Sequence, residues 1–230
     1  MKDIYNDRTY LTRNPTWNAE DAPFKAAGIL RLLVNLDIST ICEIGCGSGE
    51  ILVQLSQRLP EDVRFFGFDI SRDAMGIAKL KETPRIRFDL RDLSAPADDL
   101  PLFDLLLVID VIEHVDNYFA FLDGIRPKGR YTVFHIPLDL SVWSLFRENI
   151  LIESKARVGH IHNFTEDFIL SVLADHGFRV VDKSYTPPTF ETMGFKQRVV
   201  NACRKMLFKI NKRLCMKLIG GYSVMVLCEN

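Results

Sequence analysis

The stretch ICEIGCGSGE, residues 41–50, runs from β-forming residues through three alternate glycines into a helical pattern. Gly45, Gly47 and Gly49 each cost backbone entropy on folding, so a turn with three glycines is expected to serve a specific purpose. A strand that enters a glycine-rich turn and then a helix lets the backbone approach a ligand closely at the carboxyl end of a parallel sheet. The stretch therefore predicts a ligand site within an α/β fold.

Strand-like and helix-like segments alternate from Thr40 onward, which is typical of βαβ units on a parallel sheet covered on both faces. Apolar spacing predicts helices over 50–59 and 72–82, and a later helix with Thr165 as N-cap and Gly177 after its end. The predicted strands are residues 40–45, 63–69, 85–90, 103–110, 130–136, 178–185 and 222–229.

The composition indicates one globular domain with additions. The chain has 230 residues, 47% of them hydrophobic, which is enough for one sizeable core. No signal peptide and no apolar run of about 18 residues is visible, so we expect a cytoplasmic protein. The five cysteines are scattered and lack CxxC spacing, which argues against disulfides or a zinc ribbon.

Residues 1–36 are expected to form an N-terminal helical extension, followed by the main domain at 37–230. A helix is predicted to begin near Pro23. Tyr10, Trp17 and Phe24 alternate with polar residues, as in an aromatic lid that excludes water from a site. The alternative is that Trp17 and Phe24 only pack the first helix on the sheet.

A basic helical insertion is expected at 190–220, between the last two strands. The net charge is −1, but residues 192–228 contain eight basic and no acidic residues. The segment 195–219 can be a helix on a membrane surface, a positive lid over an anionic acceptor, or a core-packed helix with a solvated charged face. Its apolar face is predicted to hold Phe195, Val199, Ala202, Cys203, Met206 and Ile210.

The glycine turn does not match a pyrophosphate site. Its spacing is GxGxG, whereas the dinucleotide fingerprint is GxGxxG, and the turn contains no Lys or Arg. Asp69 follows Gly49 by 20 residues, at the end of the next strand, where a carboxylate can accept hydrogen bonds from both hydroxyls of a ribose. The expected ligand therefore carries a sugar, with or without phosphate.

Four segments in this order, EIGCGSG, GFDIS, FDLRDLS and FDLLLVIDVIEHV, resemble the signature motifs of class I S-adenosylmethionine-dependent methyltransferases. The resemblance implies a Rossmann-like, seven-stranded, mostly parallel sheet with an antiparallel last strand, and S-adenosylmethionine as cofactor. The residues that it places around the cofactor are Glu43, Gly45, Gly47 and Gly49 at the methionine part, Asp69 at the ribose, Asp92 and Leu93 at the adenine, and Asp110 beside the reactive methyl group. Ile70, next to Asp69, is also expected to contact the cofactor.

Two histidine-bearing segments, DVIEHV and GHIHNF, provide the candidate catalytic groups. In one interpretation His114 or His160 is a general base with Glu113 beside it, as in the quinone-type O-methyltransferases that this EH pair resembles. In a second, Asp110, Glu113, His114 and His160 bind a divalent metal, because one helical turn would bring the first three together. A third assigns these residues structural roles alone.

The metal interpretation rests on similarity to the small-RNA terminal 2′-O-methyltransferases, whose pattern is ExxEH followed by a distant His. Asp110 replaces the first Glu here, and His162 competes with His160 for the ligand position.

The function expected first is O-methylation of a small-molecule acceptor, anionic and lipid-linked acceptors included, by in-line transfer. The alternatives are a metal-dependent enzyme acting on an RNA end and a non-catalytic cofactor-binding subunit. A nucleic-acid partner is not expected, because the body of the chain is acidic.

Overall fold

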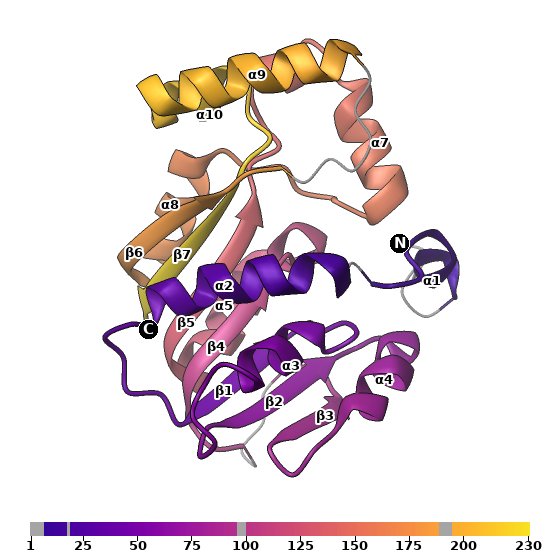
Figure 1. Ribbon diagram of the computed structural model, residues 1–230, viewed down its shortest axis with the longest axis vertical. Coiled ribbons are helices and arrows are strands. Elements are labelled where there is room, and N and C mark those ends of the chain that lie inside the picture. The colour runs from indigo at the N-terminus through magenta and orange to yellow at the C-terminus, as the bar shows by residue number, and fades with distance from the viewer. Residues whose placement is uncertain (1–6, 18, 96–99, 189–194) are drawn as a thin grey trace.

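The computed structural model describes residues 7–17, 19–95, 100–188 and 195–230, with the backbone alone for 195–199. Seven strands form one sheet in the order β3-β2-β1-β4-β5-β7-β6 (Figure 1). The strands are β1 (Thr40–Ile44), β2 (Arg64–Asp69), β3 (Ile86–Leu90), β4 (Phe103–Ile109), β5 (Gly129–Pro137), β6 (Arg179–Thr186) and β7 (Ser223–Glu229).

The sheet confirms the predicted fold class. β1 pairs in parallel with β2 and β4, and β7 is antiparallel to both of its neighbours, β5 and β6. The chain reverses the direction of strand order between β1 and β4, so the carboxyl ends of these two strands form a switch point where ligands bind in open α/β sheets.

Helices cover both faces of the sheet, as expected. One face packs against α2 (Ala22–Leu32), α3 (Glu50–Ser56) and α4 (Arg72–Ala78), and the other against α5 (Tyr118–Ile125) and α8 (Glu166–Asp175). β4 is buried over almost its whole length because it lies at the centre between both helical layers. The short 3-10 elements are η1 (Ala19–Asp21), η2 (Lys79–Lys81), η3 (Ile112–His114) and η4 (Arg126–Lys128).

Local signals for helix ends are confirmed. The Thr165 side chain accepts a hydrogen bond from the backbone N–H of Phe168 and so caps α8. Gly177, just beyond that helix, has φ +81°, a left-handed conformation that suits glycine. Pro23 lies in the first turn of α2, where its missing N–H costs nothing.

The remaining helices are α1 (Thr9–Arg13), α6 (Val142–Leu145), α7 (Asn149–Val158), α9 (Phe195–Ile210) and α10 (Lys212–Leu218). In Figure 1, α7, α9 and α10 lie at one end of the molecule and β3 and α4 at the other. None of the helices within the described ranges is long and apolar enough to cross a membrane.

The basic segment differs from the sequence prediction in two ways. It is two helices, because Asn211 leaves the helical conformation and caps α10 with its side chain. The predicted apolar face also does not face the core: Ala202, Cys203, Met206 and Ile210 are exposed, whereas Arg204 is buried and Leu207 and Phe208 pack on the core. The side chains of Phe195 and Val199, and residues 190–194, lie outside the described part.

Candidate active site

The glycine turn is built by backbone conformation and close packing. Gly45, Gly47 and Gly49 all have positive φ, between 53° and 76°. A Cβ on Gly45 would come within 2.6 Å of the Val111 side chain, and one on Gly49 within 2.4 Å of Phe88. At Gly47 the nearest atom would be Cε3 of Trp17, at an ordinary 3.6 Å. Any side chain at Gly45 or Gly49 would therefore displace the neighbouring elements.

Two predicted cofactor-binding carboxyl groups flank this turn. Glu43, at the end of β1, is 1% exposed, and its Oε2 has no hydrogen-bond partner among the described residues. Burial raises the pKa of Glu43 well above its usual value. Asp69, at the end of β2, accepts hydrogen bonds from the backbone N–H groups of Gly47 and Ser71, each at 2.8 Å. Burial also raises the pKa of Asp69.

The other predicted cofactor-binding residues are Ile70, directly after β2, and the two predicted for the adenine, Asp92 and Leu93, after β3. Ile70 exposes 59% of its surface directly beside Asp69, which leaves an apolar face for a planar ring. Asp92 is exposed, and its Oδ1 accepts from the backbone N–H and the hydroxyl of Ser94, at 2.8 and 2.6 Å. The Leu93 side chain is buried in the core, so only its backbone is available to a ligand.

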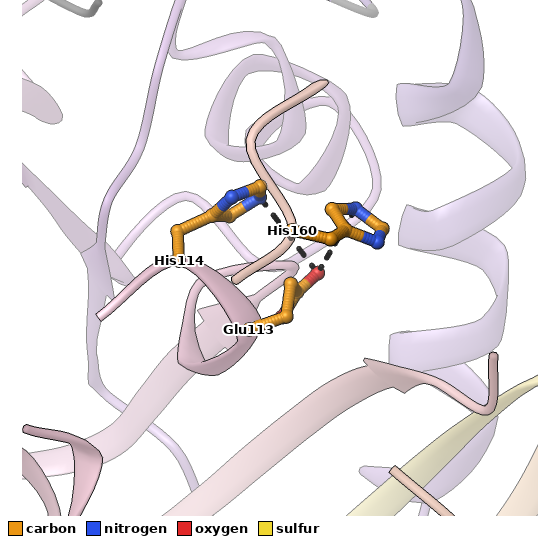
Figure 2. Close-up of side chains that lie close together, drawn as sticks. All are labelled: Glu113, His114 and His160. Carbon is orange, nitrogen blue, oxygen red and sulfur yellow. Dashed lines mark ion pairs between the residues drawn. The ribbon is translucent and has the colours of Figure 1, made fainter. Parts of the chain in front are cut away.

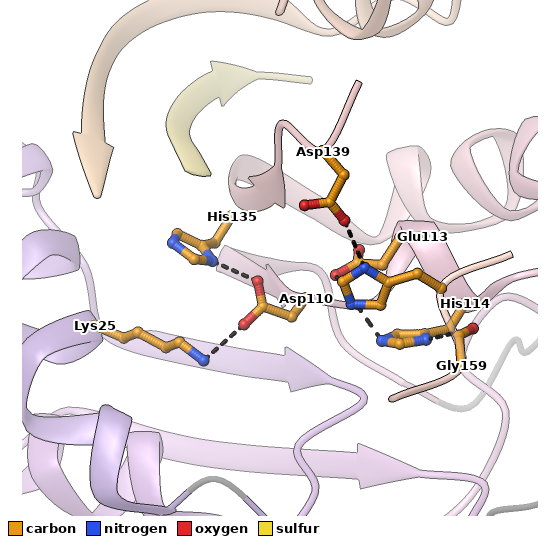
Figure 3. A network of polar contacts seen from close by, with 8 residues as sticks. Lys25, Asp110, Glu113, His114, His135, Asp139 and Gly159 are labelled. Carbon is orange, nitrogen blue, oxygen red and sulfur yellow. Dashed lines mark hydrogen bonds and ion pairs between the residues drawn. The ribbon is translucent and has the colours of Figure 1, made fainter. Parts of the chain in front are cut away.

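Asp110 follows β4 in a left-handed conformation, with φ +54°. Its Oδ2 lies 2.6 Å from the ammonium of Lys25, and its Oδ1 accepts from Nδ1 of His135 at 2.5 Å (Figure 3). Burial alone would raise the pKa of Asp110, but His135 and Lys25 together hold it well below the usual value. Asp110 is therefore a charged, doubly paired carboxylate.

Glu113, His114 and His160 form a second cluster (Figure 2). Glu113 is fully buried, and neither of its carboxyl oxygens has a hydrogen-bond partner among the described residues. Its Oε1 lies 3.9 Å from Nε2 of His114 and 4.0 Å from Nε2 of His160. Burial, and then the negative charge of Asp110, raise the pKa of Glu113 well above its usual value.

His114 is neutral at physiological pH. Burial and the nearby His160 lower its pKa to about 4. Its Nδ1 lies 3.0 Å from the carbonyl oxygen of Gly159, and a carbonyl only accepts, so Nδ1 carries the proton. The lone pair of the neutral ring is therefore on Nε2, which faces Glu113 and His160.

His160 is oriented by a carboxylate. Its Nδ1 lies 2.8 Å from Oδ2 of Asp139, and its Nε2 faces Glu113. A carboxylate that accepts from Nδ1 fixes the tautomer with the lone pair on Nε2 and stabilises the imidazolium that forms when Nε2 takes a proton. The rings of His160 and His114 meet edge to face, with centroids 5.0 Å apart.

The structure brings together three of the four residues predicted as metal ligands. The ligand atoms of Glu113, His114 and His160 all lie within 4.8 Å of one another, but Asp110 is not in this group. The helical turn η3 begins only at Ile112, so the spacing from Asp110 does not act as helical spacing. His162 does not compete either, because its Nε2 contacts the carbonyl oxygen of Val115 at 3.0 Å.

Three members of this network were not predicted from the sequence: Lys25, His135 and Asp139. Lys25 and Asp110 are 85 residues apart, and His135 and Asp110 are 25 apart, so no local pattern joins them. The one available signal was position: His135 and Asp139 lie at and just after the end of a predicted strand, at the edge of the sheet where ligands bind.

The chain matches the model of the methyltransferase domain family over residues 17–183. These residues include the glycine turn and the cluster around Glu113 and His160. The protein is a class I S-adenosylmethionine-dependent methyltransferase. S-adenosylmethionine is the cofactor of this family, and the methyltransferase carries an orphaned, buried carboxyl group at Glu43 where the cofactor's cationic methionine part is expected.

Two curated relatives are similar to the methyltransferase over part of their lengths. It is 35% identical over 109 residues to a ubiquinone biosynthesis O-methyltransferase of Rhodopseudomonas palustris, covering 46% of this chain and 40% of that one. It is 27% identical over 127 residues to a trans-aconitate 2-methyltransferase of Deinococcus radiodurans, covering 50% and 47%. The chain thus matches less than half the length of either relative.

A solved structure shares the fold of the methyltransferase over its whole length. Magnesium protoporphyrin IX methyltransferase from Synechocystis PCC 6803, solved with S-adenosylhomocysteine bound, has a TM-score of 0.65 at 17% identity, with 100% of both chains covered.

Proposed function

We propose that this methyltransferase methylates an oxygen atom of a small-molecule acceptor, with His160 as general base. The observation that carries the proposal is the pair of His160 and Asp139. Nδ1 of His160 lies 2.8 Å from a carboxylate oxygen of Asp139, while Nε2 of His160 faces Glu113. A hydroxyl acceptor must lose its proton during methyl transfer, whereas an amine can lose it afterwards to water, so a placed base favours oxygen.

The cofactor site that we propose runs along the carboxyl ends of β1, β2 and β3. Glu43 and the backbone of the glycine turn would hold the methionine part, Asp69 the ribose, and Ile70 with the loop at Asp92 and Leu93 the adenine. Val111 packs against Gly45, so the segment from Asp110 to His114 directly adjoins the turn. This contact supports a methyl group presented beside Asp110 and toward the histidine cluster.

The bound cofactor supplies a methyl group on a sulfonium centre. The protein aligns the acceptor oxygen with that carbon and accepts the acceptor's proton at Nε2 of His160. Asp139 then stabilises the imidazolium. His114, neutral and fixed by Gly159, and Glu113 are positioned to orient the acceptor's polar atoms.

The acceptor class that we propose is a small molecule, with anionic and lipid-linked forms included. One curated relative is named for O-methylation in ubiquinone biosynthesis and the other for methylation of trans-aconitate. We propose the extension at 1–36 as a lid over the site: Trp17 contacts the glycine turn, and the guanidinium of Arg13 donates to the carbonyl oxygen of Ala156 on α7.

A divalent metal is a second use of the same cluster. The carboxylate of Glu113 and the Nε2 atoms of His114 and His160 form a mixed oxygen and nitrogen donor set, and neutral His114 is ready to coordinate. A cation there would lower the pKa of Glu113 and polarise a bound hydroxyl acceptor.

The experiment measures formation of S-adenosylhomocysteine with phenols, carboxylic acids and amines as acceptors. For the best oxygen acceptor, we expect His160→Ala to lower kcat by roughly a hundredfold or more, and Asp139→Asn by a smaller factor, with cofactor affinity unchanged. His176→Ala is the matched control, because His176 forms the same kind of pair, at 2.6 Å, with Asp123 on the surface.

Turnover in His160→Ala near the wild-type rate, or transfer to amines alone, would contradict the proposal. Activity measured in the presence of EDTA distinguishes general-base catalysis by His160 from metal binding by the cluster. Activity that EDTA abolishes and Mg²⁺ or Mn²⁺ restores indicates the metal, whereas activity that EDTA leaves intact indicates the general base alone.

A further inference from the structure

Large apolar side chains are exposed on α6, on α7 and on the loop between them. Phe146, between the two helices, exposes 85% of its surface and Ile152 on α7 exposes 63%. Trp143 and Leu145 on α6 are also exposed. Side chains of this size normally enter the core, so several of them on adjoining turns mark an interaction surface.

The basic helices continue this surface. Met206 and Ile210 on α9 expose 61% and 74% of their surfaces, and Leu214 and Leu218 on α10 are exposed as well. The two helix pairs are joined, because the hydroxyl of Ser141, the N-cap of α6, donates to the carbonyl oxygen of Ile219 just after α10. Figure 1 shows α7, α9 and α10 at the same end of the molecule.

The exposed apolar side chains of α9 stand among cations. Lys205 and Lys209 are exposed beside Met206 and Ile210, and no acidic residue occurs in 192–228. Arg213 and Lys217 of α10 are partly neutralised, since both contact Asp167 of α8, at 2.9 and 3.0 Å. The positive charge therefore lies chiefly on α9.

We propose that this surface, formed by α6, α7, α9 and α10, docks on a lipid bilayer that carries anionic headgroups. Apolar side chains beside lysines fit the boundary between headgroups and acyl chains, where both groups are satisfied at once. A second copy of this chain fits less well, because a symmetric contact would bring two sets of lysines together. Docking here is of the peripheral kind and requires no spanning helix.

The same surface adjoins the active site. α7 ends at Gly159, whose carbonyl oxygen accepts the Nδ1 proton of His114, and His160 follows directly. A protein docked through α7 would therefore hold its histidine cluster close to the bilayer surface, where an acceptor with an apolar tail resides. The docking itself does not depend on methyl transfer and is measured without it.

The test is co-sedimentation of the full chain with vesicles of phosphatidylcholine alone and of phosphatidylcholine with phosphatidylglycerol. We expect binding to the anionic vesicles, weakened when salt shortens the range of electrostatic attraction. Lys205→Glu combined with Lys209→Glu should lower the partition coefficient by roughly tenfold or more, given about 1 kcal/mol for each basic residue near an anionic surface. Phe146→Ser combined with Ile210→Ser should also weaken binding.

The matched control is Lys79→Glu combined with Leu80→Ser, because Leu80 exposes 87% of its surface beside a lysine in η2, which directly follows α4 at the opposite end of the molecule. This variant should bind like the wild type. Absence of binding to anionic vesicles at low salt overturns the proposal, as does equal loss in the control. A wild-type dimer that Phe146→Ser with Ile210→Ser dissociates, without vesicle binding, would assign the surface to a second copy instead.

Discussion

Three carboxyl groups lie at the same edge of the sheet, those of Glu43 and Glu113 buried and that of Asp110 half-buried, and their surroundings separate their pKa values. Asp110 is paired with His135 and Lys25, and the pKa of its carboxyl falls. Within the described part of the chain, Glu43 and Glu113 have no hydrogen-bond partners for buried carboxyl oxygens, and burial raises the pKa of each. Groups held in this way tend to mark functional sites, because a fold selected only for stability would pair them.

Glu43→Gln should therefore raise stability while weakening cofactor binding. The variant removes a charge that the folded state disfavours, a gain of about 1 kcal/mol on the scale of one unsatisfied buried polar group, which corresponds to a rise in Tm of roughly 2–4 °C at pH 7. Because the folded pKa lies above the unfolded value, wild-type stability falls as pH rises above about 4.5. The gain should accordingly disappear as pH is lowered toward 4.5.

Thermal unfolding of both proteins between pH 4.5 and 8, with titration of S-adenosylhomocysteine, measures the two effects. Glu50→Gln is the control, because hydrogen bonds from Lys81 and Gln54 outweigh burial and lower the pKa of Glu50. The Tm of the Glu50→Gln variant at pH 7 should be lower than that of the wild type. A Glu43→Gln protein less stable than the wild type at pH 7 would show that Glu43 is paired in the folded state.

At the scale of elements, the N-terminal extension approaches the glycine turn through one aromatic side chain. The half-buried Trp17 lies against Gly47 and also against the ring of Tyr10, with centroids 4.8 Å apart, while Phe24 on α2 is exposed. Of the three aromatic residues in the predicted lid, Trp17 thus lies beside the turn and Tyr10 packs on Trp17. Trp17 is placed to sense any ligand that enters there.

The chain has two tryptophans, Trp17 and Trp143, so single-tryptophan variants report on each separately. In Trp143→Phe, the emission of Trp17 should shift when S-adenosylhomocysteine binds, because the ligand changes the polarity and packing around the indole. In Trp17→Phe, the emission of the remaining Trp143 on α6 should not change when the ligand binds. Trp17→Ala should weaken affinity by roughly 3- to 10-fold, the scale of one aromatic contact. Equal responses from both single-tryptophan variants would contradict the lid.

The strands could be predicted from sequence because their alternation and burial are local properties. The orientation of the basic helices could not be predicted in this way. An amphipathic pattern shows that a helix has an apolar face but not which way that face points in the fold. Arg204 is buried against the end of the sheet and Met206 is left outside, an outcome decided by α10 and by the loop at Gly221, which approaches the guanidinium of Arg204. The site follows the same rule: His114 and Glu113 were visible in a motif, whereas Asp139 and Lys25 reach it only through tertiary folding.

At the scale of the whole molecule, the positive charge is concentrated in one segment of the chain. Eight of the 29 basic residues lie in 192–228, and the remaining 21 stand against 30 acidic ones, which leaves the rest of the chain at −9. The proposed cofactor site, along β1, β2 and β3, lies beside Asp110 after β4, and Asp110 contacts Lys25 of α2. A ligand bound there connects elements from distant parts of the chain, so its binding should raise the Tm of global unfolding.

S-adenosylhomocysteine at about 100 times its Kd should stabilise the protein by about 2.7 kcal/mol, or roughly 5–10 °C in Tm, whereas NAD should give no shift because the turn lacks a pyrophosphate cradle. Asp69→Ala should lose most of the shift. Asp104→Ala is the matched control: Asp104 also accepts two backbone N–H groups, those of Ser39 and Thr40, each at 3.0 Å, but at the amino end of β4. Both substitutions remove a carboxylate that holds two backbone N–H groups. The ligand-induced shift of each variant is therefore measured from the Tm of the same variant without ligand. A full shift in Asp69→Ala would remove Asp69 from the cofactor site, and a shift lost equally in Asp104→Ala would mean that sheet stability rather than ligand contact controls the response.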